Sequence, residues 1–507
     1  MGKAPYFLGI DVGTYESKGT IIDKNCQVIA SHAEKHDMEN PRPGHFEHDA
    51  DKVWWGDVCK ISKALLDKTG IDPYDIGGIG TSALGADLVP IDEQGNPLRK
   101  AILYGIDARA HKEIDYLNEI FDEEDVLDFN GRPLCSNDIP PKILWLKNNE
   151  PEVWEKADKL LTGSSFLTAK LTGEYVIDRF LAFGAFTPLY DRDTGEIDER
   201  FCDMFCRPSQ LAEVKDTTDI AGVVTQKASL ETGLAPGTPV IVGADDSGAE
   251  AISTGVFEVG DMMLQFGSSL YMIGLSSKII KDRRIWSGGF IIPGVYSVQG
   301  GTNAAGTLTK WYRDHLFMDA AAEENDTGEN AYQIMMRGID DIPPGSDGLI
   351  TLPYIAGERT PLNDPAAKGV LFGLSIQHTR AHMYRSALEA IGYTVAQHLA
   401  IFQENGVRIN RVLAVGGGTK NPKWLHMISD ITGCRIETTK VTIGASFGDA
   451  IMAAVGVGHI PNFKELKKIF QPGDVYEPDE KRHRQYRHYQ EIFDRLYPST
   501  KKLMHRV

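Results

Sequence analysis

VGADDSGA, which occupies residues 242–249, joins a predicted strand to a predicted helix and decides how the rest of the chain is interpreted. Residues 238–242 form an apolar run typical of a buried strand, and small residues follow Asp246, as at the start of a helix. A carboxylate at the end of a buried strand is partly removed from water yet open to a small molecule, which suits a general base for a hydroxyl group. The alternative is that Asp246 only caps the helix, because such turns also favour a capping carboxylate.

The composition indicates a globular enzyme with more than one domain. At 507 residues the chain exceeds the size of one hydrophobic core, and 42% hydrophobic with 24% charged residues is ordinary for this class. A formal charge of −18, with no basic stripe, argues against nucleic acid as a partner. No apolar stretch approaches the roughly 18 residues of a membrane-spanning helix, and the first residues show no signal peptide. We therefore expect neither a membrane nor nucleic acid among the partners.

The cysteines indicate a reducing compartment. Six cysteines in so long a chain do not form a disulfide framework. Cys202 and Cys206 are four residues apart, but no second cysteine or histidine pair lies nearby at zinc spacing. Reduced thiols and a cytoplasmic location are the simplest interpretation.

The order of predicted elements indicates an α/β chain with two similar halves. Apolar runs at residues 6–10 and 19–22 flank a glycine-containing turn, and runs at 261–266 and 270–275 flank a second one. Each half thus opens on strand, turn and strand, which suggests an internal duplication with a boundary near residue 250 and a ligand cleft between the halves. Further patterns predict helices at 49–66, 304–316, 379–402, 422–432 and 445–455, and strands at 27–30, 76–81, 88–91, 289–292 and 296–299.

The first turn, DVGTYESK at residues 11–18, has the composition of a phosphate-binding loop. Gly13 lets backbone N–H groups approach phosphate oxygens, Thr14 adds a hydroxyl and Lys18 adds a positive charge. Asp11 can hold Mg²⁺ directly or through water. A plain β-hairpin is the alternative for this loop taken alone.

Two more glycine-rich turns lie in the second half. QFGSS, residues 265–269, repeats the composition of the first turn, and two such hairpins can hold a polyphosphate from opposite sides. AVGGGTKN, residues 414–421, is a strand that runs into three glycines and then a helix, so an adenine ring could lie against bare backbone there. A tight strand–helix turn is the alternative. Neither a dinucleotide fingerprint nor a P-loop occurs in a strand–helix context.

The segment GVLFGLSIQHTRAHMYRSALE, residues 369–389, resembles the C-terminal signature of the FGGY carbohydrate kinases. GERTP at residues 357–361 and Asp364-Pro365 also resemble that family, as do the turns at Asp11, Gly267 and Gly416 and the acid at Asp246. The resemblance runs from about residue 5 to about residue 457. The constrained signature positions that match are Gly369, Leu371, Gly373, Leu374, His382, Met383, Ser386, Ala387, Leu388 and Glu389.

The resemblance implies an α/β fold of two actin-like, ribonuclease-H-like ATPase domains around a central cleft. Residues 1–251 would bind the sugar and residues 252–507 the nucleotide. The implied activity is ATP-dependent phosphorylation of a primary hydroxyl of an open-chain sugar, with a pentulose such as xylulose as the best candidate. Asp246 falls on the catalytic base of the family, and Asp11 and Asp246 would position Mg²⁺. The implied ATP contacts are Gly13, Thr14, Lys18, Gly267, Ser268, Ser269, Gly416, Gly417, Gly418 and Asn421.

The sugar-contacting turn departs from the family pattern. Glycerol kinases carry an Arg-Glu pair and xylulokinases a Met-His pair where this chain has Gly85 and Ala86. Asn137 stands where glycerol kinases carry a tyrosine, so glycerol is a poor candidate, and the missing histidine weakens xylulose as well. Asp87 could accept hydrogen bonds from two sugar hydroxyls, or it could be an outward-facing strand acid.

The predicted substrate contacts combine this turn with a second element. Asp107 and Arg109 match the D-x-R of ketose kinases, although one residue is inserted before them. The full set of predicted substrate contacts is Asp87, Asp107, Arg109, Asn137 and Asp246.

Several alternatives stay open. Within the family, a polyol, hexulose or sugar-acid kinase fits the same motifs. Outside it, an actin-like ATPase could act as a regulator or chaperone, although such proteins lack the GERTP and signature segments. A catalytically silent sugar-binding regulator would require loss of the base or of the phosphate loops, and both are present. Dimers are common among the similar proteins, so a homodimer is a candidate assembly.

Overall fold

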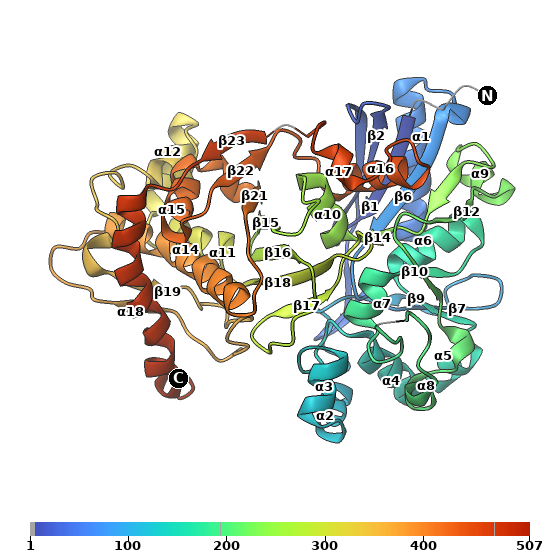
Figure 1. Ribbon diagram of the computed structural model, residues 1–507, viewed down its shortest axis with the longest axis horizontal. Helices are drawn as coiled ribbons and strands as arrows, with labels where there is room; N and C mark the ends of the chain where they lie inside the picture. The colour runs from blue at the N-terminus through green and yellow to red at the C-terminus, as the bar shows by residue number, and fades with distance from the viewer. Residues whose placement is uncertain (1–5, 193, 471) are drawn as a thin grey trace.

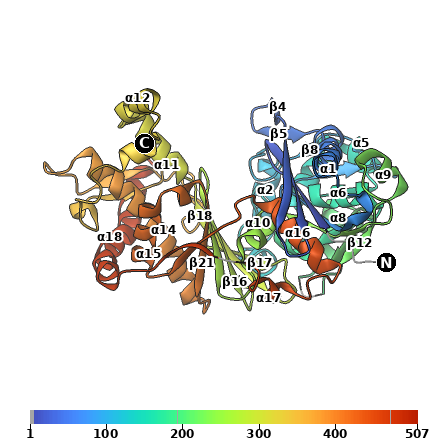
Figure 2. The ribbon, with the colours of Figure 1, turned by 90° about the horizontal axis from the view of Figure 1, so that it is seen from above.

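Two lobes of mixed strands and helices make up the computed structural model, which describes residues 6–192, 194–470 and 472–507 (Figure 1). Each lobe is built on a seven-stranded sheet. Seen from above, α10 (Asp246–Thr254) and α16 (Ala445–Gly456) lie between the lobes (Figure 2). The α/β architecture that the sequence predicted is therefore confirmed.

In the first lobe, the strand that carries the DVGTYESK turn is central. β1 pairs antiparallel with β2 and parallel with β6, and the sheet order is β12-β13-β6-β1-β2-β3 with β14 beside β6. The strands are β1 (Tyr6–Val12), β2 (Glu16–Asp23), β3 (Val28–Lys35), β6 (Ile76–Ala83), β12 (Ile220–Val223), β13 (Pro239–Ile241) and β14 (Ala244–Asp245).

The second lobe repeats this pairing. β15 pairs antiparallel with β16 and parallel with β21, in the order β17-β18-β16-β15-β21-β22-β23. The expected strand at 289–292 is wrong in its bounds, because β17 ends at Gly289 and a turn closed by the Phe290 N–H on the Val295 carbonyl follows. The strands are β15 (Asp261–Phe266), β16 (Leu270–Ser276), β17 (Trp286–Gly289), β18 (Tyr296–Thr302), β21 (Arg411–Gly416), β22 (Ile436–Thr439) and β23 (Pro472–Tyr476).

Smaller sheets lie outside these two. β4 (Glu39–Arg42), β5 (His45–His48) and β8 (Ala101–Ile102) form one, and the two-stranded ones are β7 (Val89–Ile91) with β9 (Lys159–Leu161), β10 (Val176–Asp178) with β11 (Glu213–Lys215), and β19 (Ile350–Leu352) with β20 (Val370–Phe372).

The helices agree with the amphipathic patterns to within a few residues. The pattern at 49–66 begins as one π-turn over Ala50–Trp55 and continues as α1 (Gly56–Thr69), with Trp54 and Trp55 buried in the core. The other first-lobe helices are α2 (His111–Ile120), α3 (Glu123–Phe129), α4 (Ile139–Asn149), α5 (Pro151–Lys156), α6 (Gly163–Thr172), α7 (Arg179–Ala185), α8 (Glu199–Phe205) and α9 (Gln226–Thr232). Those of the second half are α11 (Gly306–His315), α12 (Met318–Thr327), α13 (Ala331–Met335), α14 (Arg380–Glu404), α15 (Pro422–Thr432), α17 (Phe463–Leu466) and α18 (Glu480–Met504).

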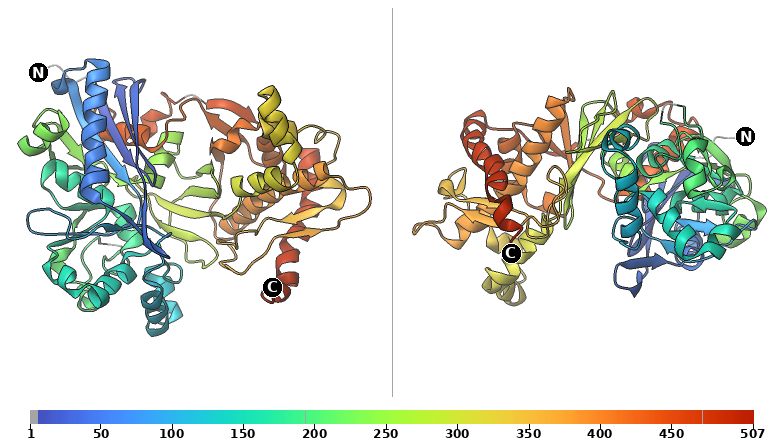
Figure 3. Two further views of the ribbon diagram at one scale, coloured as in Figure 1. Left: turned by 180° about the vertical axis from the view of Figure 1, so that it is seen from behind. Right: turned by 90° about the horizontal axis from the view of Figure 1, so that it is seen from below.

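Glycines let α16, from the second half of the chain, close onto the sheet of the first lobe. A Cβ on Gly9 would lie 2.0 Å from the Ser446 carbonyl oxygen, and one on Gly80 would lie 2.4 Å from the Asp449 carbonyl oxygen. On the opposite face, a Cβ on Gly19 would lie 2.2 Å from Ile61 of α1. Figure 3 shows α1, in blue, along the outer side of this sheet. The sheet is therefore enclosed between α1 and α16, whose backbones and side chains leave no room for larger residues.

One hydrophobic cluster connects the lobes. It contains Phe7 of β1, Ile252 of α10, Met263 of β15 and Ile451 of α16. The division into domains at residue 251 stays a prediction. The structure adds that α16, which comes from the second half of the chain, packs against the first lobe.

The charged residues of the C-terminal region suggest a helix face that is exposed to solvent. The structure agrees with this only in part. α18 presents Lys and Arg side chains to solvent, but it buries Tyr486, Phe493 and Leu496 in the core of the second lobe. All six cysteines are free thiols. Among the helices of the described residues, none combines the length and apolar character that crossing a bilayer would demand.

Candidate active site

A cavity of about 360 Å³ opens between the lobes. Parallel strands β1 and β6 end beside it, and in such sheets ligands bind at the carboxyl ends of the strands. Its lining combines both lobes: Gly85, Ala86, Tyr104, Asn130, Arg132, Asn137, Phe180, Leu181, Phe183, Gly184, Ala185, Asp245, Asp246, Ser247, Tyr271, Trp286, Ser287, Gly288, Gln299 and Arg359.

The two adjacent acids of VGADDSGA have different partners. Asp245 is the N-cap of α10: its carboxylate accepts the Gly248 N–H at 2.8 Å and the Ser247 hydroxyl at 2.6 Å. Asp246 is the first helical residue and faces the cavity. Gly243 allows this turn, because its φ is +88° and a Cβ there would lie 2.4 Å from the Thr81 carbonyl oxygen. The capping role considered for Asp246 therefore belongs to Asp245.

The electrostatics around Asp246 favour proton uptake. Burial raises the pKa of its carboxyl group well above the ordinary value, and the nearby carboxyl groups of Asp245 and Asp11 raise it further. A carboxylate whose pKa is raised toward neutrality is a better match for abstracting a proton at physiological pH than an ordinary surface acid. The role of Asp246 as a general base stays a prediction, with which its position at the cavity and its raised pKa agree.

Asp11 lies at the end of β1 and is tied to a second buried acid. The Ser82 hydroxyl lies 3.0 Å from Asp11 Oδ1 and 2.7 Å from Oδ2 of Asp449, which comes from α16. The Ser82 hydroxyl has one hydrogen and can donate it to only one of the two carboxyl groups. The other contact is a hydrogen bond when one of the two acids carries a proton. Burial raises the pKa of Asp449 well above its ordinary value and that of Asp11 to about 7. Asp449 is fully buried and is the better place for this proton.

The turn after β1 is built closely around glycine. The Gly13 N–H donates to the Glu16 carbonyl at 3.1 Å, and a Cβ at this position would lie 2.9 Å from the same oxygen. The Thr14 hydroxyl lies 3.2 Å from the hydroxyl of Tyr104, a cavity-lining residue, so the loop adjoins the cavity. Lys18 forms a half-exposed ion pair with Glu16 at 3.2 Å.

The other two glycine-rich turns lie side by side in the second lobe. Phe266 of β15 pairs with Gly416 of β21, which places residues 267–269 and 416–418 at the carboxyl ends of neighbouring parallel strands. Gly416 has a φ of +88°, and a Cβ on it would lie 2.3 Å from the Phe266 carbonyl oxygen. The Gly267 carbonyl accepts the Gly306 N–H at the start of α11. Asn421 caps α15 by accepting the Trp424 N–H at 3.2 Å.

Ser268 and Ser269 complete the hairpin of the second lobe. Gly267 donates its N–H to the Ser269 carbonyl, and the Ser268 carbonyl accepts the N–H groups of Ala305 and Thr307. These contacts hold the hairpin against the start of α11. The predicted nucleotide contacts of this lobe, from Gly267 to Asn421, thus surround one edge of its sheet.

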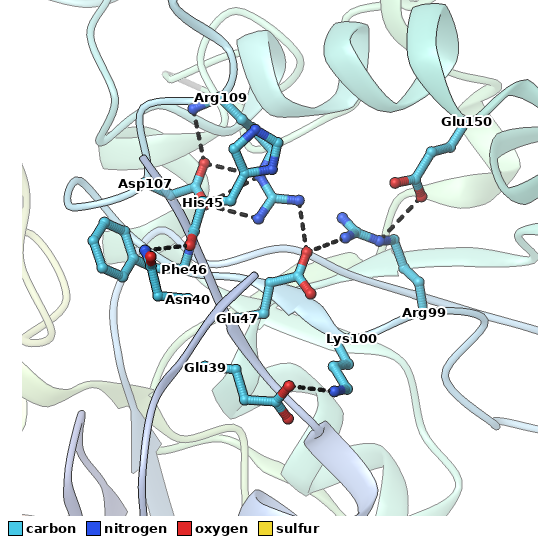
Figure 4. Close-up of polar contacts among 10 residues, drawn as sticks. All are labelled: Glu39, Asn40, His45, Phe46, Glu47, Arg99, Lys100, Asp107, Arg109 and Glu150. Atoms are coloured by element: carbon cyan, nitrogen blue, oxygen red, sulfur yellow. Dashed lines mark hydrogen bonds and ion pairs between the residues drawn. The ribbon is translucent and has the colours of Figure 1, made fainter. Parts of the chain in front are cut away.

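Asp107 and Arg109 do not line the cavity. Figure 4 shows them in a buried cluster in which Arg109 donates to Asp107 at 2.8 Å and to Glu47 at 2.8 Å. Asp107 also accepts the Phe46 N–H at 2.6 Å, and the Arg109 guanidinium stacks 5.0 Å from the Trp145 ring centroid. These contacts indicate a structural role, whereas substrate binding by the pair stays a prediction.

Asp87 is buried behind the sugar-contacting turn. Its Oδ1 accepts the Gly163 N–H at 2.8 Å, and its Oδ2 has no hydrogen-bond partner within the described ranges. It is not an outward-facing acid, because its side chain is inaccessible to solvent, and burial raises its pKa to about 7. Lys142 stabilises this turn, because its Nζ donates a hydrogen bond to the Ala86 carbonyl oxygen at 2.5 Å. Direct sugar contact by Asp87 stays a prediction.

Sequence reasoning placed Asn137 and Asp246, and the structure brings both into the cavity. It missed Arg132, Trp286 and Arg359. Arg359 belongs to the GERTP motif, which indicated the family but no role for the arginine. Arg132 and Trp286 carry no motif, and only the fold brings their segments together.

The acidic edge of the first lobe fits a divalent cation. In the described part of the chain, no three His, Cys, Asp or Glu side chains converge to hold a metal by themselves. Mg²⁺ usually takes only one or two carboxylates, with water and substrate phosphates as its other ligands. The carboxyl groups of Glu250 and Asp245 lie close enough to raise the pKa of Asp11 further, so negative charge accumulates there. This charge is what a bound cation would compensate.

Comparisons with known proteins agree along nearly the whole chain. The family model of the FGGY family of carbohydrate kinases matches with its N-terminal domain at residues 6–253 and with its C-terminal domain at residues 263–457. A xylulose kinase of Staphylococcus epidermidis is 29% identical over 499 residues, covering 98% of this chain and 97% of that protein. A gluconokinase of Bacillus subtilis is 26% identical, with coverage of 97% and 95%.

A solved structure shows the same arrangement of lobes. The crystal structure of a xylulose kinase from Rhodospirillum rubrum superimposes with a TM-score of 0.90 at 27% identity, covering 99% of this chain and all of that one. The two-domain, actin-like ATPase fold expected from the sequence is therefore confirmed.

Proposed function

Since this chain belongs to the FGGY family of carbohydrate kinases, we propose that it transfers the γ-phosphoryl group of ATP to a primary hydroxyl of an open-chain pentulose such as xylulose. That it is an ATP-dependent carbohydrate kinase follows from the family. The choice of pentulose rests on the similarity to xylulose kinases over the full chain. An actin-like regulator or chaperone is not supported by any of these matches.

The observation that carries the proposal is the position of Asp246. Its carboxyl group faces a cavity shared by both lobes, while Asp245 takes the capping contacts that would otherwise occupy it. In the proposed reaction Asp246 accepts the proton of the attacking hydroxyl, and the turns at Gly13, Gly267 and Gly416 bind the nucleotide. Such transfers depend mainly on positioning and on neutralisation of charge.

Asp11, with Asp246, is the proposed holder of Mg²⁺. When bound there, the ion would neutralise the negative charge of the phosphates. Ser82 orients the Asp11 carboxyl group by its 3.0 Å contact, and Asp449 fixes Ser82 from the other side.

The small residues of the sugar-contacting turn leave the substrate open to alternatives. Gly85 and Ala86 present backbone and one methyl group to the cavity, so a hexulose, polyol or sugar acid longer than a pentulose also fits the site. The similarity to a gluconokinase keeps the sugar acids in consideration.

A coupled ADP-release assay against a panel of ketoses, polyols and aldonates tests the function. We expect one pentulose to raise ADP release well above basal ATP hydrolysis. Highest kcat/KM for an aldonate or a polyol would reassign the substrate within the family, whereas no turnover above the basal rate with any panel member would overturn the proposal.

We propose a homodimer that forms through the segment around β20. Phe372, Leu374 and Ile376 are 48%, 54% and 103% exposed, an unusual concentration of apolar surface for a free monomer. β20 pairs only with β19 among the described strands, so a twofold axis could pair β20 with its own copy. We also propose a cytoplasmic location, in keeping with the free cysteines.

Sedimentation velocity tests the assembly. The wild-type protein should sediment as a dimer, and the double variant Phe372→Glu, Ile376→Glu as a monomer. Leu230→Glu, at an exposed apolar residue of the first lobe, is the matched control and should stay dimeric. A monomeric wild-type protein, or a dimeric double variant, would contradict this interface.

A further inference from the structure

Arg359 is a half-buried cation whose buried Nε has no hydrogen-bond partner among the described residues. It lines the interlobe cavity from the second lobe. The other cavity arginine, Arg132, binds Asp138 through both Nη atoms, at 2.8 and 2.9 Å. No ion pair to Arg359 is found within the described residues, and its Nε has no hydrogen-bond partner there. A buried N–H donor left without a partner costs free energy, which a ligand that accepts from it would recover.

The surroundings hold the Arg359 side chain in place without neutralising it. Its Nη2 donates to the Leu270 carbonyl, and its guanidinium lies 5.9 Å from the Trp286 ring centroid. The adjacent Glu358 is occupied by the Thr302 hydroxyl at 2.5 Å and by the N–H groups of Asn303 and Arg359. Burial raises the pKa of Glu358 to about 7, so this acid is only a partial counter-charge.

Arg359 lies between the proposed binding site of the ATP phosphates and the proposed base. Leu270, which its Nη2 contacts, directly follows the hairpin Gly267–Ser269 that we assign to the phosphates. The cavity that it lines also contains Asp246, the proposed base. Arg359 is thus next to the hairpin on one side and shares the cavity of Asp246 on the other, which suits a contact to a phosphoryl group that moves between them.

We propose that Arg359 is a catalytic residue that binds the non-bridging oxygens of the phosphoryl group during transfer. The inference rests on the proposed function. The sugar hydroxyl oxygen forms a bond to the γ-phosphorus, the bond from the γ-phosphorus to the β,γ-bridging oxygen breaks, and ADP leaves with that electron pair. The hydroxyl proton passes to Asp246. Arg359 keeps all its protons and donates hydrogen bonds to the oxygens on which charge is concentrated.

This role supplies from the second lobe a cation that the sugar-contacting turn lacks. Gly85 and Ala86 have no charged side chain, and Arg132 is already neutralised by Asp138. In this proposal Arg359 contacts the phosphoryl group more closely in the transition state than in bound ATP. Contacts made only in the transition state raise kcat rather than ground-state affinity.

The test compares Arg359→Gln and Arg359→Lys with Arg337→Gln, a control in which an exposed arginine paired with Glu323 and Glu329 is replaced. We expect Arg359→Gln to lower kcat by about 10³-fold, the size of effect that a transferring-phosphoryl arginine has in other kinases and GTPases. KM for ATP and sugar should change little, and Arg337→Gln should behave as wild type. Lysine should restore only part of the rate, because it lacks the planar fork of donors.

Two readouts separate this role from a merely structural one. Arg359→Ala should regain activity in millimolar guanidinium chloride, and Arg359→Gln should bind ADP normally but lose the binding of ADP with aluminium fluoride, which mimics the phosphoryl group in transfer. No rescue together with normal binding of the fluoride complex would overturn the proposal.

The substrate panel also tests whether Arg359 binds the carboxylate of a sugar acid instead of the phosphoryl group. A carboxylate-binding Arg359 would raise KM for aldonates in Arg359→Gln while leaving kcat for neutral ketoses unchanged, and that result would overturn the proposal. Wild-type protein without turnover on any sugar would overturn the proposed function and this inference with it. Normal wild-type turnover with an equally active Arg359→Gln would overturn the inference alone.

Discussion

Asp245 and Asp246 are neighbours with the same side chain, yet the backbone gives them different tasks. The N-cap position aims Asp245 at the Gly248 N–H, while the next residue turns its carboxyl group to the cavity. Asparagine caps helices about as well as aspartate. Substitution by asparagine therefore separates the two roles at a single pair of positions.

We expect Asp246→Asn to lower kcat by about 10²- to 10⁴-fold, the contribution typical of a general base, with nearly normal ATP binding. Asp245→Asn is the matched control and should keep the thermal midpoint and most of the activity. The measurements are ADP release and nucleotide titration calorimetry. Wild-type activity in Asp246→Asn would move the base to another residue.

At the scale of elements, the cluster around Arg109 joins β5, the segment after β8 and α4. Arg109 bonds to Asp107 and Glu47 (Figure 4). It also stacks on Trp145, and none of these residues lines the cavity. Removing one partner of a buried charge network leaves the remaining charges uncompensated. Arg109→Met should therefore lower the free energy of unfolding by about 3 to 5 kcal/mol.

The KM for the sugar tests whether the cluster around Arg109 also binds substrate. We expect the folded fraction of Arg109→Met to keep a wild-type KM for the sugar, measured at low temperature to preserve folding. A large rise in KM with unchanged stability would instead support the substrate contact expected from the D-x-R motif.

Asp449 on α16 makes stability depend on pH. The unfolded chain releases this proton near pH 4, whereas the folded protein keeps it to higher pH, because burial raises the pKa. The folded state then binds more protons within this window. The free energy of unfolding consequently falls as pH rises through it, by at most about 1.4 kcal/mol per pH unit, and the contribution is fully present below the window.

Asp449→Asn removes this dependence, since an amide stays uncharged and can still donate to Ser82. The thermal midpoint of the variant relative to wild type should rise between pH 5 and pH 8 in scanning calorimetry. An equal difference at both values would mean that Asp449 is ionised in the folded protein.

At the scale of the molecule, the proposed reaction requires the lobes to approach. Asp246, the proposed base, and Asn137 line the cavity from the side of the first lobe, and Arg359 and Gln299 from the side of the second. Closure around bound substrates is the usual way such sites exclude water. Small-angle X-ray scattering should show a smaller radius of gyration with sugar and a non-hydrolysable ATP analogue together than with either alone. An unchanged radius would contradict closure.

Local patterns predicted most strands and the glycine-rich turns well, because each depends on neighbours in sequence. The strand at 261–266 and the helix at 422–432 have the predicted bounds. Side chains that meet only through the fold were not predictable in this way. Arg132, Trp286 and Asp449 come from distant segments. The contacts of Asp107 and Arg109 with Glu47 and Trp145 likewise depend on the fold, whereas their predicted contact with substrate stays a prediction.

The packing of α16 on β1 and β6 has a consequence during synthesis. When the first 260 residues have been made, every strand of the first sheet has been synthesised, but the helix that covers one face of it is still almost 200 residues away. Until that helix emerges, Gly9, Gly78 and Gly80 leave a shallow, uncovered groove along the nascent sheet. The first sheet consequently gains its full cover only after the second half of the chain has been made.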